Sequence, residues 1–541
     1  MAATTCLVLV AMLAVPEGVP APEWLSLDAM LPSRLLALAP GESTRLPAWP
    51  LEPGRRADVR LTRRDVYAPG AEIDIVDGKA SRQAPRSNLV FFFGESAEDD
   101  ATRVLVSVDP ATMRLSSFVR TPEGWTELRP LERPDEYVLA PEEGFLAPGV
   151  EPPVFECEPE MSGPPEETPD LPKRSAEIAQ AATMREMTLA VDTDNELMSQ
   201  KFANDTASAA DYVASLVALM SVIYERDLSV RLLLGTTFLR VSTTPDPYLQ
   251  SGTGNADSAK LTEFRDYWVA NYTGVSRGAA MLLSGKQSSV TSASGIGYVN
   301  SLCSGTRGYT FSQVFKYSGS TASSDTKLVA HEVGHNFGSS HTHCYLTPTP
   351  IDTCYSGESG CYSGPTSCPA PQTINGVANV RGTLMSYCHL LSGCSSSSVF
   401  HPRTIELLDP IVDSKVGVCV FPASSSNPKE ASPSGTMTAV RGAASSVSVT
   451  YAPACGATDH TVYAGNLATL RAGGLAWSQR FCSVGSSGSL SFTPAGSVYF
   501  VVAGDNGTTE GSYGQATVGE RPPAGPGGAC SYTQDLSGAC P

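Results

Sequence analysis

The chain has 541 residues, of which 17% are charged, and a formal net charge of −18 at pH 7. Such acidity argues against a nucleic-acid-binding protein, because contact with phosphates requires a positively charged surface. At roughly 100 to 200 residues per domain, the length predicts three or four structural units rather than one.

An apolar run, residues 6–15, lies close to the N-terminus and is followed by small residues and prolines. It has the length of a signal-peptide core and is too short to span a membrane, although no Lys or Arg precedes it. No later segment reads as a run of about 20 apolar residues. We therefore expect a signal peptide at residues 1–18 and a secreted protein without a membrane span.

Residues 19–150 consist of short β-branched or aromatic runs, such as residues 88–93, separated by charged and Pro/Gly turns. This pattern predicts a β-rich leader. Residues 151–173 are acidic and proline-rich without periodicity, which predicts an extended linker. The pair Lys173 and Arg174 offers a dibasic site for removal of the leader, and an ordinary solvated pair is the alternative.

Residues 183–421 alternate between strand and helix patterns. Apolar and β-branched runs predict strands, and apolar residues at helical spacing predict amphipathic helices. The expected strands are residues 186–192, 228–241, 278–283 and 295–302, and the expected helices are residues 207–224, 261–272 and 326–337. This order favours a mixed sheet backed by helices.

Residues 331–341 read His-Glu-Val-Gly-His-Asn-Phe-Gly-Ser-Ser-His. On a helix, His331 and His335 project from one face and can bind the same metal ion. Gly338 can end the helix and turn the chain, so that His341 becomes a third ligand. Three neutral nitrogens leave one position open for water, which is typical of catalytic zinc, and Glu332 lies beside them without being a ligand.

Two other interpretations of this motif are weaker. The chain has only 7 histidines, so a chance match at these positions has a probability on the order of 10⁻⁵ or less. A structural zinc site would need a fourth ligand, for which Cys344 is the nearest candidate. That arrangement would leave Glu332 without a role, and the surrounding cysteines suggest a disulfide for Cys344.

The chain has 14 cysteines, of which Cys6 lies in the signal and Cys157 stands alone, leaving an even set of 12. Eight of them could form four disulfides that hold the Pro/Ser/Gly-rich residues 345–382: Cys303, Cys344, Cys354, Cys361, Cys368, Cys388, Cys394 and Cys419. The natural remaining pairs are Cys455 with Cys482 and Cys530 with Cys540. The sequence does not fix the connectivity.

Beyond residue 421 the composition changes again. Residues 422–437 are a Ser/Pro-rich linker, residues 438–520 hold many short alternating runs, and residues 521–541 are a Pro/Gly-rich tail. The alternating runs predict a small β-sandwich, with a weak resemblance to a fibronectin type III module. It could capture substrates or surfaces, or serve only folding and secretion.

The pattern His331-Glu332-x-x-His335-x-x-Gly338-x-x-His341 resembles the metzincin zinc-peptidase signature. Residues 383–387, Thr-Leu-Met-Ser-Tyr, resemble its Met-turn, and the text around the histidines is most similar to the reprolysin or adamalysin group. The resemblance implies that Met385 forms an apolar floor beneath the histidines. It also implies a multidomain protein with an α/β metzincin catalytic domain over residues 183–421, in which a mixed twisted sheet is backed by helices.

The same resemblance implies a zinc-dependent metalloendopeptidase with protein or peptide substrates. Zinc lowers the pKa of its bound water toward about 7 and polarises the scissile carbonyl. Glu332 would accept the proton of that water and pass it to the leaving amine. A supporting calcium ion is compatible with the sequence, but no residue pattern indicates one.

Two positions depart from the adamalysin pattern. Thr342 stands after the third histidine, where adamalysins usually have Asp. Tyr387 is similar to a tyrosine of astacins and serralysins that binds zinc or steadies the transition state; a core tyrosine is the alternative. His343 and His389 lie near the motif, and we assign them to the polar surface or to contacts behind the metal ligands.

The leader, residues 19–182, resembles in its position a propeptide that inhibits the enzyme. In related zymogens a propeptide cysteine occupies the open zinc position, and Cys157 is the only unpaired candidate, with an inert thiol as the alternative. Residues 295–302 resemble the cleft strand that pairs with a substrate backbone, and an interior strand is the alternative. A secreted adhesion or scaffold protein with a non-catalytic zinc-peptidase fold, or a zinc hydrolase of another bond, would share these motifs.

Overall fold

The computed structural model describes residues 21–96, 98, 101–120, 125–145, 154–157, 184–241, 246–249, 255–286, 292–316 and 322–423. In the C-terminal region it describes residues 430–432, 437–442, 445–454, 457, 459–485, 488–505, 509–516, 519–524, 532–534 and 536. The molecule divides into two compact units, one of residues 1–34, 45–61 and 65–423, and one of residues 35–44, 62–64 and 424–541.

The leader is rich in strands, as predicted. In its described residues one sheet has the strand order β1-β10-β9-β8-β7-β6-β3-β2, and the pairings from β1 through β6 are antiparallel. The bounds are β1 Glu23–Ser26, β2 Ser43–Glu52, β3 Arg55–Arg64, β6 Val90–Ser96, β7 Arg103–Asp109, β8 Arg114–Arg120, β9 Trp125–Pro130 and β10 Glu136–Pro141, with the short helix α1 at Leu31–Leu36.

The expected mixed sheet is also present. Its strand order is β11-β15-β16-β14-β12-β13-β4-β5, with β19 also paired to β12. Strands β16, β14, β12, β13 and β4 run parallel, and β15 is antiparallel to β16. The bounds are β4 Ile73–Asp77, β5 Ala80–Ala84, β11 Val154–Cys157, β12 Arg185–Thr193, β13 Val230–Arg240, β14 Ala279–Ser284, β15 Ser292–Gly297, β16 Tyr309–Gln313 and β19 Val420–Pro422.

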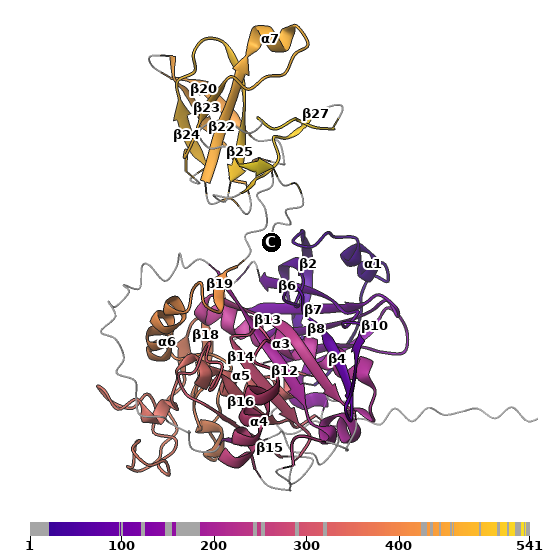
Figure 1. Cartoon of the computed structure of the whole chain (residues 1–541), viewed down its shortest axis with the longest axis vertical. Coiled ribbons are helices and arrows are strands. Elements are labelled where there is room, and N and C mark those ends of the chain that lie inside the picture. Colours follow the sequence, from indigo (N-terminus) through magenta and orange to yellow (C-terminus); the bar gives the residue numbers. More distant parts are fainter. Residues whose placement is uncertain are drawn as a thin grey trace, which may run out of the picture. The chain divides into compact units, whose positions relative to one another are not determined.

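Helices cover both faces of this sheet. Successive strand residues point to opposite sides, so neighbouring residues of one strand pack against different helices. Leu189 and Val191 of β12 pack in one core with helices α3 (Thr206–Leu228), α5 (Ser323–Phe337) and α6 (Pro402–Ser414). Ala190, between them, joins a second core with α4 (Ser258–Asn271). Figure 1 shows α3 and α5 lying along the strands of this sheet.

Helix α3 is the longest helix described and extends the predicted one at both ends. Asp205 caps its N-terminus by accepting from the backbone N–H groups of Ala207 and Ser208, and Ser229 ends it in a left-handed conformation. By length and composition α3 is long and apolar enough to span a membrane. The sequence was expected to contain no such segment after the N-terminal apolar run. However, 72% of its most apolar window is buried, as in the core helix of a folded domain.

Two strand predictions differ from the structure. The strand expected at residues 295–302 ends at Gly297, because the backbone N–H groups of Asn300 and Ser301 donate to the C-terminal carbonyls of α5 instead of to a sheet partner. Strand β16 was not predicted. It is short, and its polar side chains Thr310, Ser312 and Gln313 are buried in the sheet.

The leader also contributes strands to this mixed sheet, which the sequence does not predict. The β4–β5 hairpin extends it through the parallel pairing of β4 with β13, and β11 pairs in parallel with β15 at the other edge. The described part of the expected extended linker is therefore a sheet strand. Leader side chains, among them Phe91, Phe93 and Phe118, pack in the same core as α3 and α5.

The described residues of the C-terminal unit contain two larger sheets and a two-stranded sheet of β27 (Gln515–Ala516) and β28 (Gly519–Glu520). One has the order β20-β21-β24 (Thr438–Arg441, Val447–Thr450, Ser489–Phe492), and the other β23-β22-β25-β26-β29 (Gln479–Phe481, Asp459–Asn466, Val498–Asp505, Thr509–Glu510, Thr533–Gln534). Val449 and Leu490 of the first sheet pack with Val462 and Val502 of the second. Two sheets thus enclose one core, and the likeness to a fibronectin type III module stays a prediction.

Two of the cysteine predictions fall in this unit. Cys482 is disulfide-bonded, but its expected partner Cys455 lies outside the described residues. Cys530 and Cys540 lie outside them as well.

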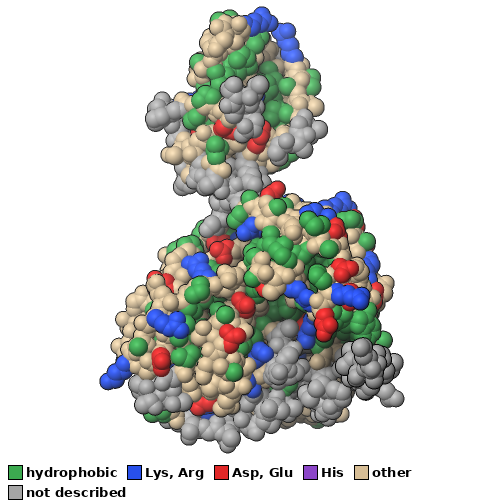
Figure 2. Space-filling model, turned by 90° about the vertical axis from the view of Figure 1, so that its right-hand side faces the viewer, with side chains coloured by type: hydrophobic (Ala, Val, Ile, Leu, Met, Phe, Trp, Pro, Cys, Tyr) green, Lys and Arg blue, Asp and Glu red, His purple; other side chains and the backbone are tan. Residues whose placement is uncertain are grey.

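On the face drawn in Figure 2, acidic and basic side chains are interspersed over the larger unit and do not gather in a patch of one sign.

Candidate metal centre

Helix α5 and the turn after it carry the predicted motif. The helix ends at Gly338, whose φ of +120° lies in the region that favours glycine and whose N–H donates to the carbonyls of Gly334 and His335. The chain then reaches His341, which precedes the short 3₁₀ turn Thr342–Cys344. The turn brings His341 back toward the helix, as the sequence predicts.

The three histidines converge on one point. His331, His335 and His341 are almost completely buried, and one ring nitrogen of each lies within 4.8 Å of the others. The Nε2 atoms of His331 and His335 are 3.1 Å apart. Burial lowers the pKa of all three imidazoles, in the case of His335 to about 3, so the rings are neutral near pH 7.

Their hydrogen bonds assign the tautomers. The Nδ1 atoms of His331 and His335 lie 2.7 Å from the carbonyl oxygens of Leu384 and Ser339. A carbonyl only accepts, so each Nδ1 carries the proton and each Nε2 is unprotonated. His341 Nδ1 lies 2.8 Å from the Glu358 carboxylate, which assigns the same tautomer.

This donor set fits a metal ion. Two unprotonated nitrogens that lie 3.1 Å apart bring their lone pairs close together, an arrangement that a cation bound to both stabilises. His341 Nε2 is buried and has no hydrogen-bond partner among the described residues. Burial of such a group costs free energy unless it is satisfied, and three neutral imidazoles are a donor set that zinc prefers.

Glu332 is buried on α5 beside strand β15. A Cβ added to Gly295 would overlap the Glu332 carboxylate, and a Cβ on Gly297 would come within 2.9 Å of the Glu332 carbonyl. Two glycines on β15 thus make room for the helix and for the acid. The sequence predicts this strand but not the contact.

The predicted Met-turn lies against the same helix. Met385 is buried, and its sulfur lies 2.7 Å from the position that a Cβ on Gly334 would take. The Leu384 carbonyl accepts from His331, and the Met385 carbonyl accepts from the N–H of Thr342 at 3.0 Å. The turn therefore supports the first histidine and the residue after the third.

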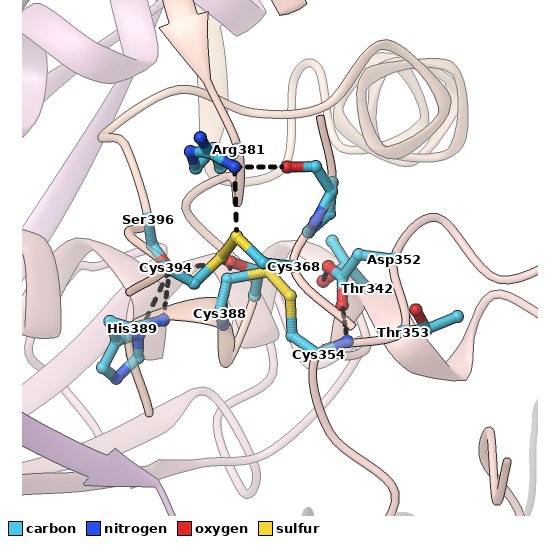
Figure 3. Close-up of a disulfide and its surroundings, with 12 residues drawn as sticks. Thr342, Asp352, Thr353, Cys354, Cys368, Arg381, Cys388, His389, Cys394 and Ser396 are labelled. Carbon is cyan, nitrogen blue, oxygen red and sulfur yellow. Dashed lines mark hydrogen bonds between the residues drawn. A yellow bond between two sulfur atoms is a disulfide. The ribbon is translucent and has the colours of Figure 1, made fainter. Parts of the chain in front are cut away.

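Tyr387 lies beside the histidines. Its ring is buried, and its centroid is 4.2 Å from that of His341 and 6.3 Å from that of His331. His389 is hydrogen-bonded to Ser396 (Figure 3). His343 is fully buried, and its Nε2 donates to Glu358 at 2.9 Å. Of its two expected positions, it therefore takes the one behind a candidate metal ligand and not the one on the polar surface.

Glu358 is a site residue that the sequence analysis missed. One carboxylate oxygen accepts from both His341 Nδ1 and His343 Nε2, and the side chain is 7% exposed. Burial acts to raise the pKa of Glu358, but the two hydrogen bonds outweigh it and lower the pKa to about 2. The residue lies in a Ser/Gly/Cys-rich loop without periodicity, so no sequence signal indicates it.

Thr342, which stands where adamalysins usually have Asp, contacts an aspartate in the structure. Its hydroxyl donates to the buried carboxylate of Asp352. Asp352 also accepts from the N–H of Cys354, and both contacts lie beside the disulfides shown in Figure 3. An aspartate from the following loop thus lies next to the residue where adamalysins usually carry one.

The eight cysteines around the motif form four disulfides, which confirms that prediction. The pairs in this described region are Cys303–Cys419, Cys344–Cys361, Cys354–Cys388 and Cys368–Cys394. Cys344 is therefore not a zinc ligand, although its sulfur lies close to His341, His343 and Glu358. Cys157 lies opposite Gly295 in the β11–β15 register, and its side chain falls outside the described part of the structure.

Comparison with known proteins agrees with the motif. Residues 183–387 match the Reprolysin_5 family model, described as Metallo-peptidase family M12. No curated protein matches the chain significantly.

Among solved structures, the chain is similar to metalloproteinase-II from Bacteroides fragilis, with 11% identity, a TM-score of 0.33, and coverage of 58% of this chain and 86% of that one. A chaperone–substrate complex gives 13% identity, a TM-score of 0.26, and coverage of 42% and 36%. The family match covers both the histidine motif and the Met-turn. Residues 183–387 therefore form a reprolysin-like metallopeptidase segment of family M12.

Proposed function

We propose that this protein is a secreted zinc-dependent metalloendopeptidase, made as a zymogen. The M12 family implies a zinc cofactor and protein or peptide substrates. The observation that carries the proposal is the convergence of three buried, neutral imidazoles whose Nε2 atoms are unprotonated. When bound there, zinc acts as a Lewis acid that activates water and polarises a carbonyl group.

Glu332 moves the proton in this proposal. Its carboxylate accepts a proton from water as the water oxygen bonds to the peptide carbonyl carbon. The same proton then passes to the peptide nitrogen as the C–N bond breaks, so the carboxylate is regenerated. Gly295 leaves the space in which this carboxylate lies. The proposed role of Tyr387, whose ring packs on His341, is to bind zinc or to steady the oxygen that gains charge, with a core tyrosine as the alternative.

Strand β15 provides the binding surface for an extended substrate. In the full chain β11 pairs with it, and Cys157 is opposite Gly295. A peptide backbone that replaced β11 would make the same kind of main-chain hydrogen bonds. This pairing supports a leader that blocks the cleft until it is removed, with the Cys157 thiol as the proposed latency ligand and an inert thiol as the alternative. Secretion is supported by the apolar run near the N-terminus.

The test uses the protein made as the full chain and then freed of its leader. It compares the wild type with the Glu332→Ala and His335→Ala variants. Zinc content is measured together with cleavage of an unfolded protein such as casein. We expect one zinc per chain and cleavage by the wild type, zinc without cleavage in Glu332→Ala, and loss of zinc in His335→Ala. Undiminished cleavage by Glu332→Ala would remove its assignment as the base. Bound zinc without cleavage by the processed wild type would favour a scaffold protein.

A further inference from the structure

The orientation of His341 depends on a side chain, unlike that of the other two histidines. His331 and His335 donate from Nδ1 to backbone carbonyls, which the Met-turn and the end of α5 hold in place. His341 lies outside the helix and donates to Glu358, 17 residues later in the chain. The third imidazole is thus held by a carboxylate from a separate loop.

We propose that Glu358 is a positioning residue for the metal centre, an inference that rests on the proposed zinc site. Its carboxylate holds His341 in the Nδ1–H tautomer, so that the Nε2 lone pair faces the other two histidines. A charged acceptor behind a metal-bound imidazole also raises the basicity of the ligating nitrogen. Substituting such a partner typically weakens metal affinity by about 10 to 100-fold.

His343 completes this support. Its Nε2 donates to the same Glu358 oxygen, and its ring lies nearly parallel to that of His341, with centroids 5.5 Å apart and an interplanar angle of 8°. The carboxylate therefore accepts from two rings two residues apart. Because both rings and the carboxylate are buried, solvent does not compete for these hydrogen bonds.

A disulfide holds the loop that brings Glu358 to this position. Cys344 directly follows His343, and Cys361, its partner, donates from its backbone N–H to the Glu358 carbonyl at 3.3 Å. The N–H of Tyr362 donates to the His343 carbonyl at 3.1 Å. The two histidines and the carboxylate are thus joined through one bridge, and zinc affinity should depend on it.

The experiment measures the zinc dissociation constant of the full chain by chelator competition. Glu358→Gln keeps the size of the side chain but removes its charge, Glu358→Ala removes the acceptor, and Glu358→Asp tests rescue. Glu406→Gln, at an exposed position of α6, is the matched control for charge. We expect about 10-fold weaker zinc binding for Glu358→Gln, up to about 100-fold for Glu358→Ala, partial recovery for Glu358→Asp and no change for the control.

Two further readouts separate positioning from folding. The absorption spectrum of the Co²⁺-loaded protein should shift in Glu358→Gln, because the geometry and donor strength of His341 change. The metal-free Glu358→Gln protein should still unfold cooperatively, at a lower Tm than metal-free Glu406→Gln, because Gln makes weaker hydrogen bonds to the two rings than the charged carboxylate does. Joint replacement of Cys344 and Cys361 by Ser should weaken zinc binding, whereas joint replacement of Cys303 and Cys419 should not.

The outcomes distinguish this inference from the proposed function. If Glu358→Gln binds zinc as tightly as Glu406→Gln and gives an unchanged cobalt spectrum, the positioning role is overturned while the zinc site stands. If the wild type binds no zinc, the proposed function fails first. If metal-free Glu358→Gln is already unfolded, the residue is structural and the proposal is rejected.

Discussion

Gly295 lies directly against the carboxylate of Glu332, with no space between them for a methyl group. The strand proposed to bind the substrate backbone and the acid proposed to move the proton therefore contact each other. Any side chain at residue 295 must displace either the strand or the acid. The position of the carboxylate is thus set from outside its own helix.

Gly295→Ala should lower kcat by about 100-fold while zinc stays bound, because a displacement of about 1 Å in a catalytic group can have an effect of this size. Casein cleavage and zinc content, measured on the same preparation, test this. Gly274→Ala is the matched control, since a Cβ there meets no atom within 4 Å. Equal activity in the two variants would show that Glu332 does not need the space at Gly295.

Removal of zinc should destabilise the unit that contains α5. A ligand present at about 1,000 times its Kd stabilises the folded state by about 4 kcal/mol. We therefore expect a chelator to lower the Tm of this unit in a calorimetric scan and added zinc to restore it. The Tm of His335→Ala should not respond to either treatment, and a response would place the ion elsewhere.

The metal-free protein should lose stability as the pH falls below about 6.5. Burial lowers the pKa of His335 from 6.5 to about 3, so between these values the unfolded chain binds a proton that the folded chain does not. At pH 5 this one residue lowers the free energy of unfolding by about 2 kcal/mol, and His331 and His341 act in the same direction. Above pH 6.5 these groups contribute no pH dependence.

Urea unfolding of the metal-free protein at pH 8, 6 and 5 measures this effect. In His335→Gln the free energy of unfolding should fall less between pH 6 and pH 5 than in the wild type, because residue 335 no longer binds a proton in the unfolded chain. A stability that stays constant down to pH 5 in the metal-free wild type would contradict the burial of the histidines.

Residues 184–423 made without the leader should be less stable than the full chain and more prone to self-association. They lose the strands that cover both edges of the catalytic sheet, and exposed sheet edges pair with other chains. They also lose the leader side of the shared core. Light scattering and thermal unfolding compare this segment with the full chain cut only between residues 158 and 183. Equal stability of the two would argue against a shared core.

The histidine site could be predicted from the sequence because its main parts lie in one helix and one turn at fixed spacing. Helical geometry orders His331 and His335, and the turn that follows Gly338 brings back His341. Glu358 and Asp352 could not be predicted, because a disulfide-held loop brings them to the site and no periodic pattern relates them to the histidines. The cysteine count predicted four disulfides there, but not their pairing.

The fold likewise contains elements that the sequence predicts and elements that it does not. Strands β12 and β14 and helix α3 were predicted, because long apolar runs specify them locally. The pairing of β4 with β13 joins residues about 160 positions apart, and strand runs in the leader do not reveal which sheet they enter. Residues 298–302 have the composition of a strand, but the backbone N–H groups of residues 300–302 donate to the carbonyls of His335 and Asn336 at the end of α5.

The disulfides between Cys344 and Cys394 overlap along the chain. The spans 344–361, 354–388 and 368–394 leave no peptide bond between Cys344 and Cys394 outside a covalent ring. A single break anywhere in this stretch would leave both new ends attached to the same molecule. A protease whose own loops are rich in Ser, Gly and Pro could therefore be nicked beside its metal centre without losing a fragment, and the nick would become visible only after reduction.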